Sequence, residues 1–265
     1  MEVCVFLVSL CASCVGGICG IGGGVVIKPV LDAFGIMSVS AISFLSGLTA
    51  LAMSSITVFR QRKLQLVDQK TGGLLGIGAI LGGIAGNELF HAIKTAAGDD
   101  AFVGAVQASA LGIITLATLI YSAYLRKRIK SYTVTSPAAC ILIGCFIGVS
   151  SSFLGIGGGP INLAVLYFAF SMDTKTAAST SLYMIVFSQS ANLLSYFVKG
   201  SFPAVPLHYL ALMILAGFLG GMIGSNICKK ISAETTDRLF SILLVLIILI
   251  CVYNTWRFSC SPAVF

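Results

Sequence analysis

The chain has 265 residues, of which 57% are hydrophobic and only 9% are charged, and its mean hydropathy is +1.02. A soluble domain carries roughly 25% charged residues, so this composition excludes an ordinary soluble globule and predicts a protein whose outer surface faces lipid. The net charge of +7 does not indicate nucleic-acid binding, because the basic residues gather in short loops beside apolar spans, as topogenic charges do.

The first half of the chain predicts five helical segments. An apolar segment at residues 3–19 ends in a run of glycines, and a shorter apolar segment follows at residues 25–35. Three longer helices are expected at about 38–59, 71–91 and 101–125. A helix needs about 20 apolar residues to cross the hydrocarbon core, so these three are expected to cross it.

The second half predicts the same five segments in the same order. The apolar segment at residues 137–154 ends at a second glycine run, and the shorter segment is residues 160–170. Longer helices are expected at about 176–198, 206–228 and 236–257. The predicted fold is therefore all-α, with three transmembrane helices after each glycine-broken pair.

Two motifs each occur twice in the chain, and the second copy follows the first at nearly the same distance in both cases. The sequence GIGGG stands at Gly20–Gly24 and again at Gly155–Gly159, 135 residues later. The stretch LGGIAG at Leu81–Gly86 matches LGGMIG at Leu219–Gly224, at an offset of 138. Internal repeats are common in transporter folds and place the binding site at the interface between the repeats. The sequence therefore predicts one integral membrane domain made of an N-terminal repeat, 1–130, and a C-terminal repeat, 131–265.

The topology depends on whether each broken pair re-enters the membrane or crosses it. With re-entrant pairs the repeats are inverted and 12 of the 16 Lys and Arg residues lie on one side, whereas crossing pairs make the repeats parallel and place 10 there. Positive charge favours the cytoplasmic side, so we favour inverted repeats. The 12 residues are Arg60, Arg62, Lys63, Lys70, Arg126, Lys127, Arg128, Lys130, Lys175, Lys229, Lys230 and Arg238.

The glycine breaks are the principal candidate site. Glycine has poor helix propensity, and irregular backbone inside a membrane is tolerated only beside protein or a water-filled cavity. Each break exposes backbone N–H groups at the positive N-terminus of a new helix, which is a ready anion site, and Pro160 suits the first turn of such a helix. The predicted binding glycines are Gly22, Gly23, Gly24, Gly157, Gly158 and Gly159. Glycine also permits close helix packing, which is the favoured role for Gly82, Gly86, Gly220 and Gly224.

Polar side chains near the breaks are further candidates for substrate contact. A buried amide or hydroxyl without a partner is costly, although membrane Ser residues often bond only to the preceding helical turn. For Lys28 two interpretations stay open: its ammonium balances a bound anion, or it extends along the helix to the membrane interface. The candidates are Lys28, Ser43, Ser46, Asn162, Ser181, Gln189 and Asn192.

Catalysis and metal binding find little support in the sequence. The nine cysteines lie mostly in apolar segments, where they behave as small hydrophobes. The two histidines, His91 and His208, lie near predicted helix ends without a carboxylate at metal-ligand spacing. We therefore expect no catalytic residue, no metal and no cofactor.

These motifs together give the chain a resemblance to the TauE/SafE family, also called the sulfite exporter or TSUP family. The resemblance rests on the paired GIGGG motifs, Pro29, the run DTKTAASTS at Asp173–Ser181 and the LGGxxG stretches. It implies a permease for sulfite, organosulfonates and related sulfur-containing anions. Pro160 follows the second GIGGG directly, whereas Pro29 lies five residues past the first, so the two copies are not equivalent.

The resulting hypothesis is a multi-pass protein of the cell membrane that transports small anions. The anion is expected to bind between the two GIGGG breaks near mid-membrane, and the lipid bilayer is the other expected partner. A non-transporting membrane scaffold or assembly factor, and a membrane enzyme, are the alternatives. The particular anion, the direction of transport, the coupling ion and the oligomeric state stay open.

Overall fold

A computed structural model describes residues 1–62, 67–126 and 128–260, and within these residues it contains helices and no strand. The predicted all-α fold is therefore confirmed. Lys63 and Lys127, which enter the charge count, lie outside the described residues. The helices are α1 (Glu2–Cys19), α2 (Gly24–Phe34), α3 (Val39–Gln61), α4 (Gln69–Ala97), α5 (Asp100–Ile120), α6 (Pro137–Phe153), α7 (Pro160–Phe170), α8 (Thr174–Lys199), α9 (Leu207–Lys230) and α10 (Ala233–Cys260), and the π-helical turn η2 (Tyr121–Leu125) continues α5.

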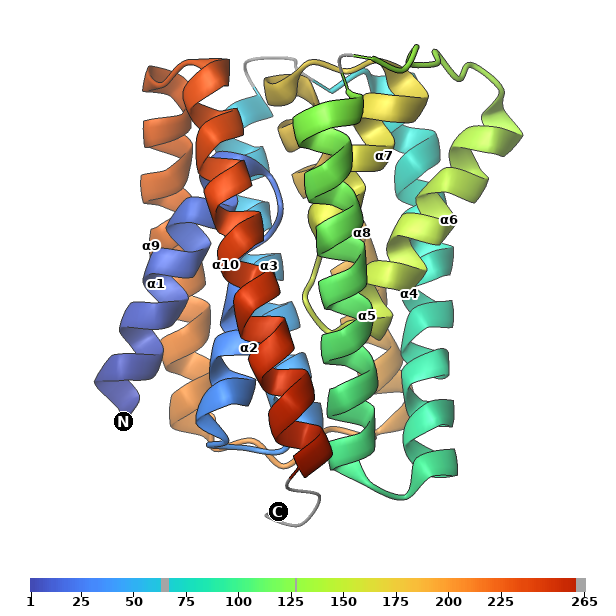
Figure 1. Ribbon diagram of the computed structural model, residues 1–265. Helices are drawn as coiled ribbons and strands as arrows, with labels where there is room; N and C mark the ends of the chain where they lie inside the picture. The colour runs from blue at the N-terminus through green and yellow to red at the C-terminus, as the bar shows by residue number, and fades with distance from the viewer. Residues whose placement is uncertain (63–66, 127, 261–265) are drawn as a thin grey trace.

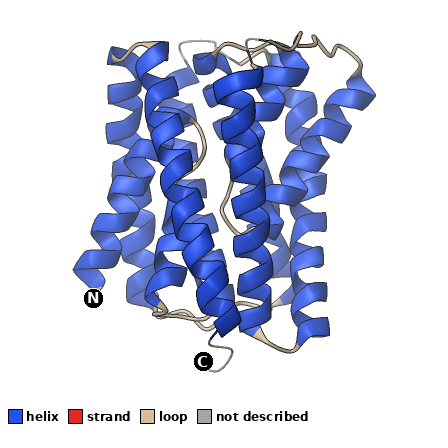
Figure 2. Ribbon diagram, viewed as in Figure 1, coloured by secondary structure: helices blue, strands red, loops and turns tan. Residues whose placement is uncertain are grey.

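The two broken pairs enter the bundle from opposite ends. Figure 1 shows α1 rising from the end that holds both chain termini, and α2 returning to that same end after a turn inside the bundle. The pair α6 and α7 starts at the other end and returns there. Figure 2 shows that the two connecting loops lie within the bundle, whereas the other loops lie at its ends. Both pairs therefore have the shape of re-entrant hairpins.

Glycine ends the first leg of each hairpin because the backbone there turns left-handed. Gly20, the C-cap of α1, has φ 78°, and its N–H bonds to the carbonyl of Gly16. In the second break Gly155, which directly follows the C-cap Leu154 of α6, has φ 63°. Residues with a Cβ atom rarely adopt such angles, so the GIGGG sequence fixes where each helix stops. Pro160 then occupies the first turn of α7, where its missing N–H costs nothing.

Within the described residues, six helices are long and apolar enough to cross a membrane: α1, α3, α4, α5 with η2, α9 and α10. These identify a multi-pass membrane protein. The prediction differs in two respects, since α1, expected to be the first leg of a re-entrant pair, is among the six, and α8, expected to cross, is not. Its 26 residues have ample length, at about 1.5 Å each, but its buried face carries hydroxyls and an amide, including Ser179, Ser181, Ser188 and Gln189. These polar side chains lower its apolarity.

The helices pack mainly across the two halves of the chain. The pairs α4–α6, α3–α9 and α5–α10 are in close contact, and so are α1–α9, α4–α8 and α3–α8. In the two halves, α1 corresponds to α6, α3 to α8, and α4 to α9. Exchanging each helix for its counterpart therefore converts the contact α4–α6 into α9–α1, and the contact α3–α9 into α8–α4. The contact pattern is thus the same when viewed from either half.

The LGGxxG glycines let paired helices approach until their backbones touch. A Cβ atom at Gly82 of α4 would overlap the carbonyl oxygen of Cys145 in α6, and one at Gly220 of α9 would lie 2.8 Å from the carbonyl oxygen of Leu10 in α1. Gly86 and Gly224 make corresponding approaches to Val149 and Cys14. These glycines have the packing role expected of small residues in membrane interfaces.

Replacing Gly82 with leucine is therefore expected to destabilise the bundle. Overpacking of about 1–3 kcal/mol corresponds to a fall in melting temperature of roughly 2–10 °C for a chain of this size. Thermal unfolding of the purified protein in detergent measures this fall. Gly73→Leu is the matched control on the same helix, because a Cβ at Gly73 meets nothing within 4 Å. Equal shifts in the two variants would contradict the packing role.

Candidate functional site

The two glycine breaks touch each other in the interior of the bundle. A Cβ atom at Gly24 would overlap the carbonyl oxygen of Ile156, and one at Gly22 would lie 3.5 Å from the carbonyl oxygen of Gly157. A Cβ at Gly158 would in turn lie 3.2 Å from the carbonyl oxygen of Ile21. All of these residues are buried. The sequence-predicted glycines of the two halves are therefore brought together, backbone against backbone.

Each break rests on the first long helix of the other half. Gly20 approaches Ala178 of α8, and Gly155 approaches Ser43 of α3. Adding the repeat offset of 135 to Gly20 and Ser43 gives Gly155 and Ala178, so the two contacts are equivalent. The Ile185 side chain of α8 fills the space where the breaks meet, since its Cδ1 atom lies 3.3 Å from a Cβ position at Gly22 and also approaches Gly158.

Two helices begin at this meeting point. In α2, the N–H groups of Val26 and Ile27 both bond to the carbonyl of Gly23, at 3.1 Å each, and in α7 the N–H of Asn162 bonds to the carbonyl of Gly159 at 3.1 Å. Within the described residues, no hydrogen-bond partner is found for the backbone N–H groups of Gly22, Gly23, Gly157 and Gly158. The unpaired donors and the positive helix ends make this region electropositive.

Serine side chains of α3 bind the second break. The Ser46 hydroxyl donates to the carbonyl of Gly155 and is 3.5 Å from that of Ser43. The Ser43 hydroxyl oxygen is buried without a partner among the described residues, and it lies 2.6 Å from a Cβ position at Gly155. Ser46 therefore holds the break in place, while Ser43 keeps a free hydroxyl beside it.

Two amides of α8 extend the polar region away from the breaks. The Gln189 amide donates to the Ser151 hydroxyl at 3.4 Å, and the Asn192 amide donates to the Gln189 carbonyl oxygen at 3.3 Å. The Gln189 side chain also approaches Gly157 and Gly47. The Asn192 carbonyl oxygen is buried and has no partner in the described part of the chain.

Asn162 and Ser181 form a separate pair at the start of α7. The Asn162 amide donates to the Ser181 hydroxyl at 3.3 Å, and both residues are at most 1% exposed. The carbonyl oxygen of Asn162 has no partner within the described residues. The pair lies one turn into the helix that follows Gly159.

Lys28 lies away from the breaks, on the second turn of α2. Its ammonium pairs with the Asp32 carboxylate at 3.0 Å, and the two side chains are 3% and 4% exposed. Arg257 donates to the carbonyls of Asp32 and Ala33 at the C-terminal end of α2. The Lys28 charge is thus balanced inside the protein, and the Lys28 side chain does not extend to the surface.

The site is closed in this structure. The pocket beside Gly158 and Gly159 is too small to hold a water molecule, and the one between α3 and α8, lined by Gly47, Gln189 and Asn192, measures about 10 Å³. A bound anion therefore requires the breaks and their neighbours to separate. Sequence reasoning missed Ile185, because an apolar residue in an apolar helix carries no distinguishing signal.

Sequence comparisons place the chain among membrane transporters. The profile of the family described as Sulfite exporter TauE/SafE matches residues 5–250. The chain is 24% identical over 258 aligned residues to the "Probable membrane transporter protein YunE" of Bacillus subtilis (strain 168), covering 91% of this chain and 93% of the relative. It is also 24% identical over 247 residues to the "Probable membrane transporter protein MJ0441" of Methanocaldococcus jannaschii, covering 86% of each.

No solved structure matches the chain. The family match nevertheless extends over nearly the whole sequence, including both glycine breaks, and both relatives are named as transporters rather than as enzymes. The composition, the six apolar helices and the full-length matches agree with one another. This chain therefore belongs to the sulfite exporter TauE/SafE family and is a multi-pass membrane transporter.

Proposed function

We propose that the protein transports small anions, namely sulfite, organosulfonates or related sulfur-containing anions, and binds them where the two glycine breaks meet. The observation that carries this proposal is the convergence of the α2 and α7 N-termini in the protein interior, with unpaired N–H groups in both breaks. Helix N-termini bind oxyanions through such donors. The family name adds the sulfur oxyanion as the substrate class.

Hydroxyl and amide groups complete the proposed site. Ser43 and Gln189 lie beside the second break, Asn192 is bonded to Gln189, and Asn162 and Ser181 lie one turn into α7. A sulfonate or sulfite has three oxygen atoms that accept hydrogen bonds, so neutral donors around a positive helix end suit it. We leave Lys28 out of the proposed site, because Asp32 already balances its charge.

We also propose that residues 1–130 and 131–265 are inverted repeats. The opposite entry of the two hairpins and the exchangeable helix contacts support this arrangement. The C-terminal ends of α3, α5 and α9 carry Arg60, Arg126 and Lys230 and lie at the end of the bundle opposite to both termini. That end is the cytoplasmic one by the distribution of positive charge.

Flux measurements in proteoliposomes test the proposed substrate class. We expect uptake of labelled sulfite, thiosulfate or a simple alkyl sulfonate above that of protein-free vesicles, and mutual competition among these anions. Chloride and a neutral sulfone of the same size are the matched comparisons. A protein that moves none of the sulfur anions would contradict the proposal and favour the non-transporting scaffold.

A further inference from the structure

Three pockets are lined by successive parts of α3 and α8. The upper pocket measures about 480 Å³, lies at the end away from both termini, and is lined among others by Gln61, Arg62, Asp68, Ser179 and Tyr183. The lower pocket measures about 490 Å³ and is lined among others by Ser40, His91, Lys94, Tyr196 and Phe202. Residues of α3, α4 and α8 line both pockets.

The two large pockets lie a membrane thickness apart. Ser40 and Gln61 stand at the two ends of α3, and their separation of 21 positions corresponds to about 32 Å along the helix, against about 30 Å for the hydrocarbon core. The small third pocket of about 10 Å³ lies between them, against Gly47, Gln189 and Asn192. The third pocket is also next to the second glycine break, because Gln189, which lines it, packs against Gly157.

An aromatic cluster separates the lower pocket from the third pocket. The ring of Tyr196 meets Phe44 edge-on, with centroids 5.0 Å apart, and meets His91 in the same way at 5.7 Å. Phe202 contacts the rings of both Phe44 and Tyr196, at 6.0 and 6.3 Å. Tyr196 lines both pockets and is only 4% exposed. Its ring is therefore the partition between them.

A different barrier separates the third pocket from the upper one. Ala50 and Met53 of α3 pack with Leu182 and Ile185 of α8 in a small apolar cluster. Ile185 is the residue that also fills the space between the glycine breaks. Opening the apolar cluster thus requires the glycine breaks to move. The aromatic cluster opens without such a movement, because its rings rotate about their own side-chain bonds.

We propose that the anion crosses the protein along the α3–α4–α8 groove, and that the ring of Tyr196, held by Phe44 and Phe202, is the gate at the end that holds the chain termini. This inference rests on the proposed transport function and adds its route and its gate. The mouth of the lower pocket is polar, with Lys94 bonded to the Ser40 hydroxyl at 2.6 Å and paired with Asp100 at 3.0 Å. Edge-to-face contacts of aromatic rings are weak enough to break and re-form during a transport cycle.

Thiol labelling tests the gate without any assumption about the substrate. The probe is a membrane-impermeant, negatively charged sulfonatoethyl thiosulfonate reagent, applied to protein in lipid nanodiscs with both ends accessible. A cysteine is introduced as Asn192→Cys in the third pocket, and the reactivity of the native cysteines is measured first in the parent protein. We expect Tyr196→Ala to raise the labelling rate of Asn192→Cys about tenfold, since it removes two edge-to-face aromatic contacts.

Two matched variants make the outcome decisive. Tyr196→Phe keeps the ring and is expected to leave labelling at the parent rate. Leu194 of the same helix is 61% exposed on the outside of the bundle, which lipid covers in a nanodisc, so Leu194→Cys is expected to react slowly with the impermeant reagent in every background. Equal rates for Asn192→Cys with Tyr196→Ala and Tyr196→Phe would overturn the gate.

Flux in proteoliposomes separates the two proposals. Accelerated labelling in a protein that carries no sulfur anion would reject the proposed substrate class and leave the gate standing. Anion flux together with labelling of Asn192→Cys that does not respond to Tyr196→Ala would reject the route and its gate, and leave the proposed function standing.

Discussion

Substituting alanine for Gly24 is expected to abolish most anion transport. The new Cβ atom would overlap the carbonyl oxygen of Ile156 in the other break, and because the obstacle is backbone, one of the two breaks has to shift. Because the clash lies in the proposed binding region, an overpacking cost of about 1–3 kcal/mol borne by the anion-bound state corresponds to roughly a 5- to 150-fold loss of flux at limiting substrate. Initial rates of labelled sulfite or alkyl sulfonate uptake in proteoliposomes measure this loss.

Matched alanine variants separate this effect from a general loss of stability. Gly73→Ala places a Cβ in open space on α4 and is expected to transport at the parent rate. Gly158→Ala, at φ 147° and against Ile185, is expected to lose transport as Gly24→Ala does. The melting temperature of each variant is recorded in detergent. A folded Gly24→Ala protein with parental flux would refute the proposed binding region.

Removing one partner of the buried pair Lys28–Asp32 is expected to destabilise the protein strongly. With both side chains at most 4% exposed, Asp32→Asn or Lys28→Met leaves one buried charge without its partner, and such losses cost about 3–5 kcal/mol. The apolar double variant Lys28→Met with Asp32→Leu is expected to recover most of this stability, because a well-packed apolar pair replaces an ion pair at little cost. Thermal unfolding of the purified proteins measures these changes.

A surface ion pair provides the control for this series. Lys199 and Glu88 are paired with side chains 38% and 51% exposed, and exposed pairs contribute about 0–1 kcal/mol. Glu88→Gln is therefore expected to leave the melting temperature nearly unchanged. The folded double variant at Lys28 and Asp32 is also expected to retain anion flux. Loss of flux in that variant would place Lys28 in the binding site.

Much of the fold followed from the pattern of apolar and glycine residues. The sequence predicted all ten helices in order and placed the two interruptions correctly, since glycine adopts without strain the left-handed backbone found at Gly20 and Gly155. Helix ends were less well predicted. The α4 helix was expected to stop near residue 91 but continues to Ala97, because the polar residues from His91 to Thr95 are compatible with a helix that extends past the apolar core.

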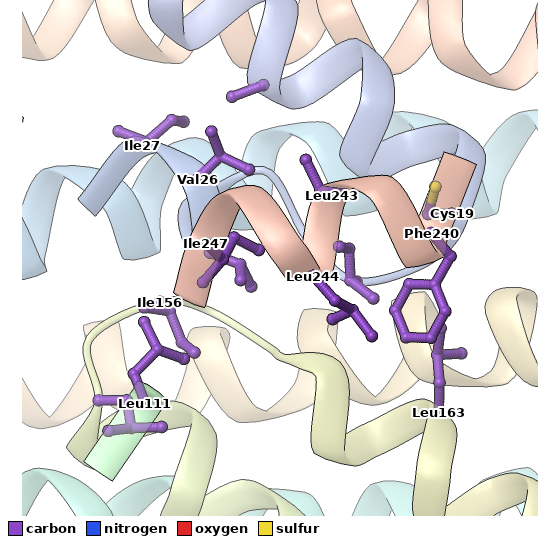
Figure 3. Packing of buried hydrophobic residues seen from close by; sticks show 14 of the residues in the cluster. Cys19, Val26, Ile27, Leu111, Ile156, Leu163, Phe240, Leu243, Leu244 and Ile247 are labelled. Carbon is purple, nitrogen blue, oxygen red and sulfur yellow. The ribbon is translucent and has the colours of Figure 1, made fainter. Parts of the chain in front are cut away.

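The packing of side chains at the site could not be predicted from the sequence. The sequence suggested that the two glycine breaks would meet, but the contact of Ile185 with both of them depends on how α8 is rotated in the bundle. The four-residue spacing of Lys28 and Asp32 allowed an ion pair on one helix face, yet its burial arises from the packing of α10 against α2. Figure 3 shows Ile247 of α10 beside Ile156 of the second break, with Val26 of α2 facing α10, and Leu244 and Ile27 belong to the same buried cluster.

Cross-half packing also constrains how the protein is made. The first break is covered by α8, and α1 lies against α9, so these surfaces have no partner while only the first half has left the ribosome. Unpaired backbone groups in lipid cost several kcal/mol each, and α1 and α2 are therefore expected to settle only after α8 and α9 have been inserted. We therefore expect the two incomplete halves to close on each other during assembly, and a chain truncated after residue 130 to lack a stable fold in the membrane.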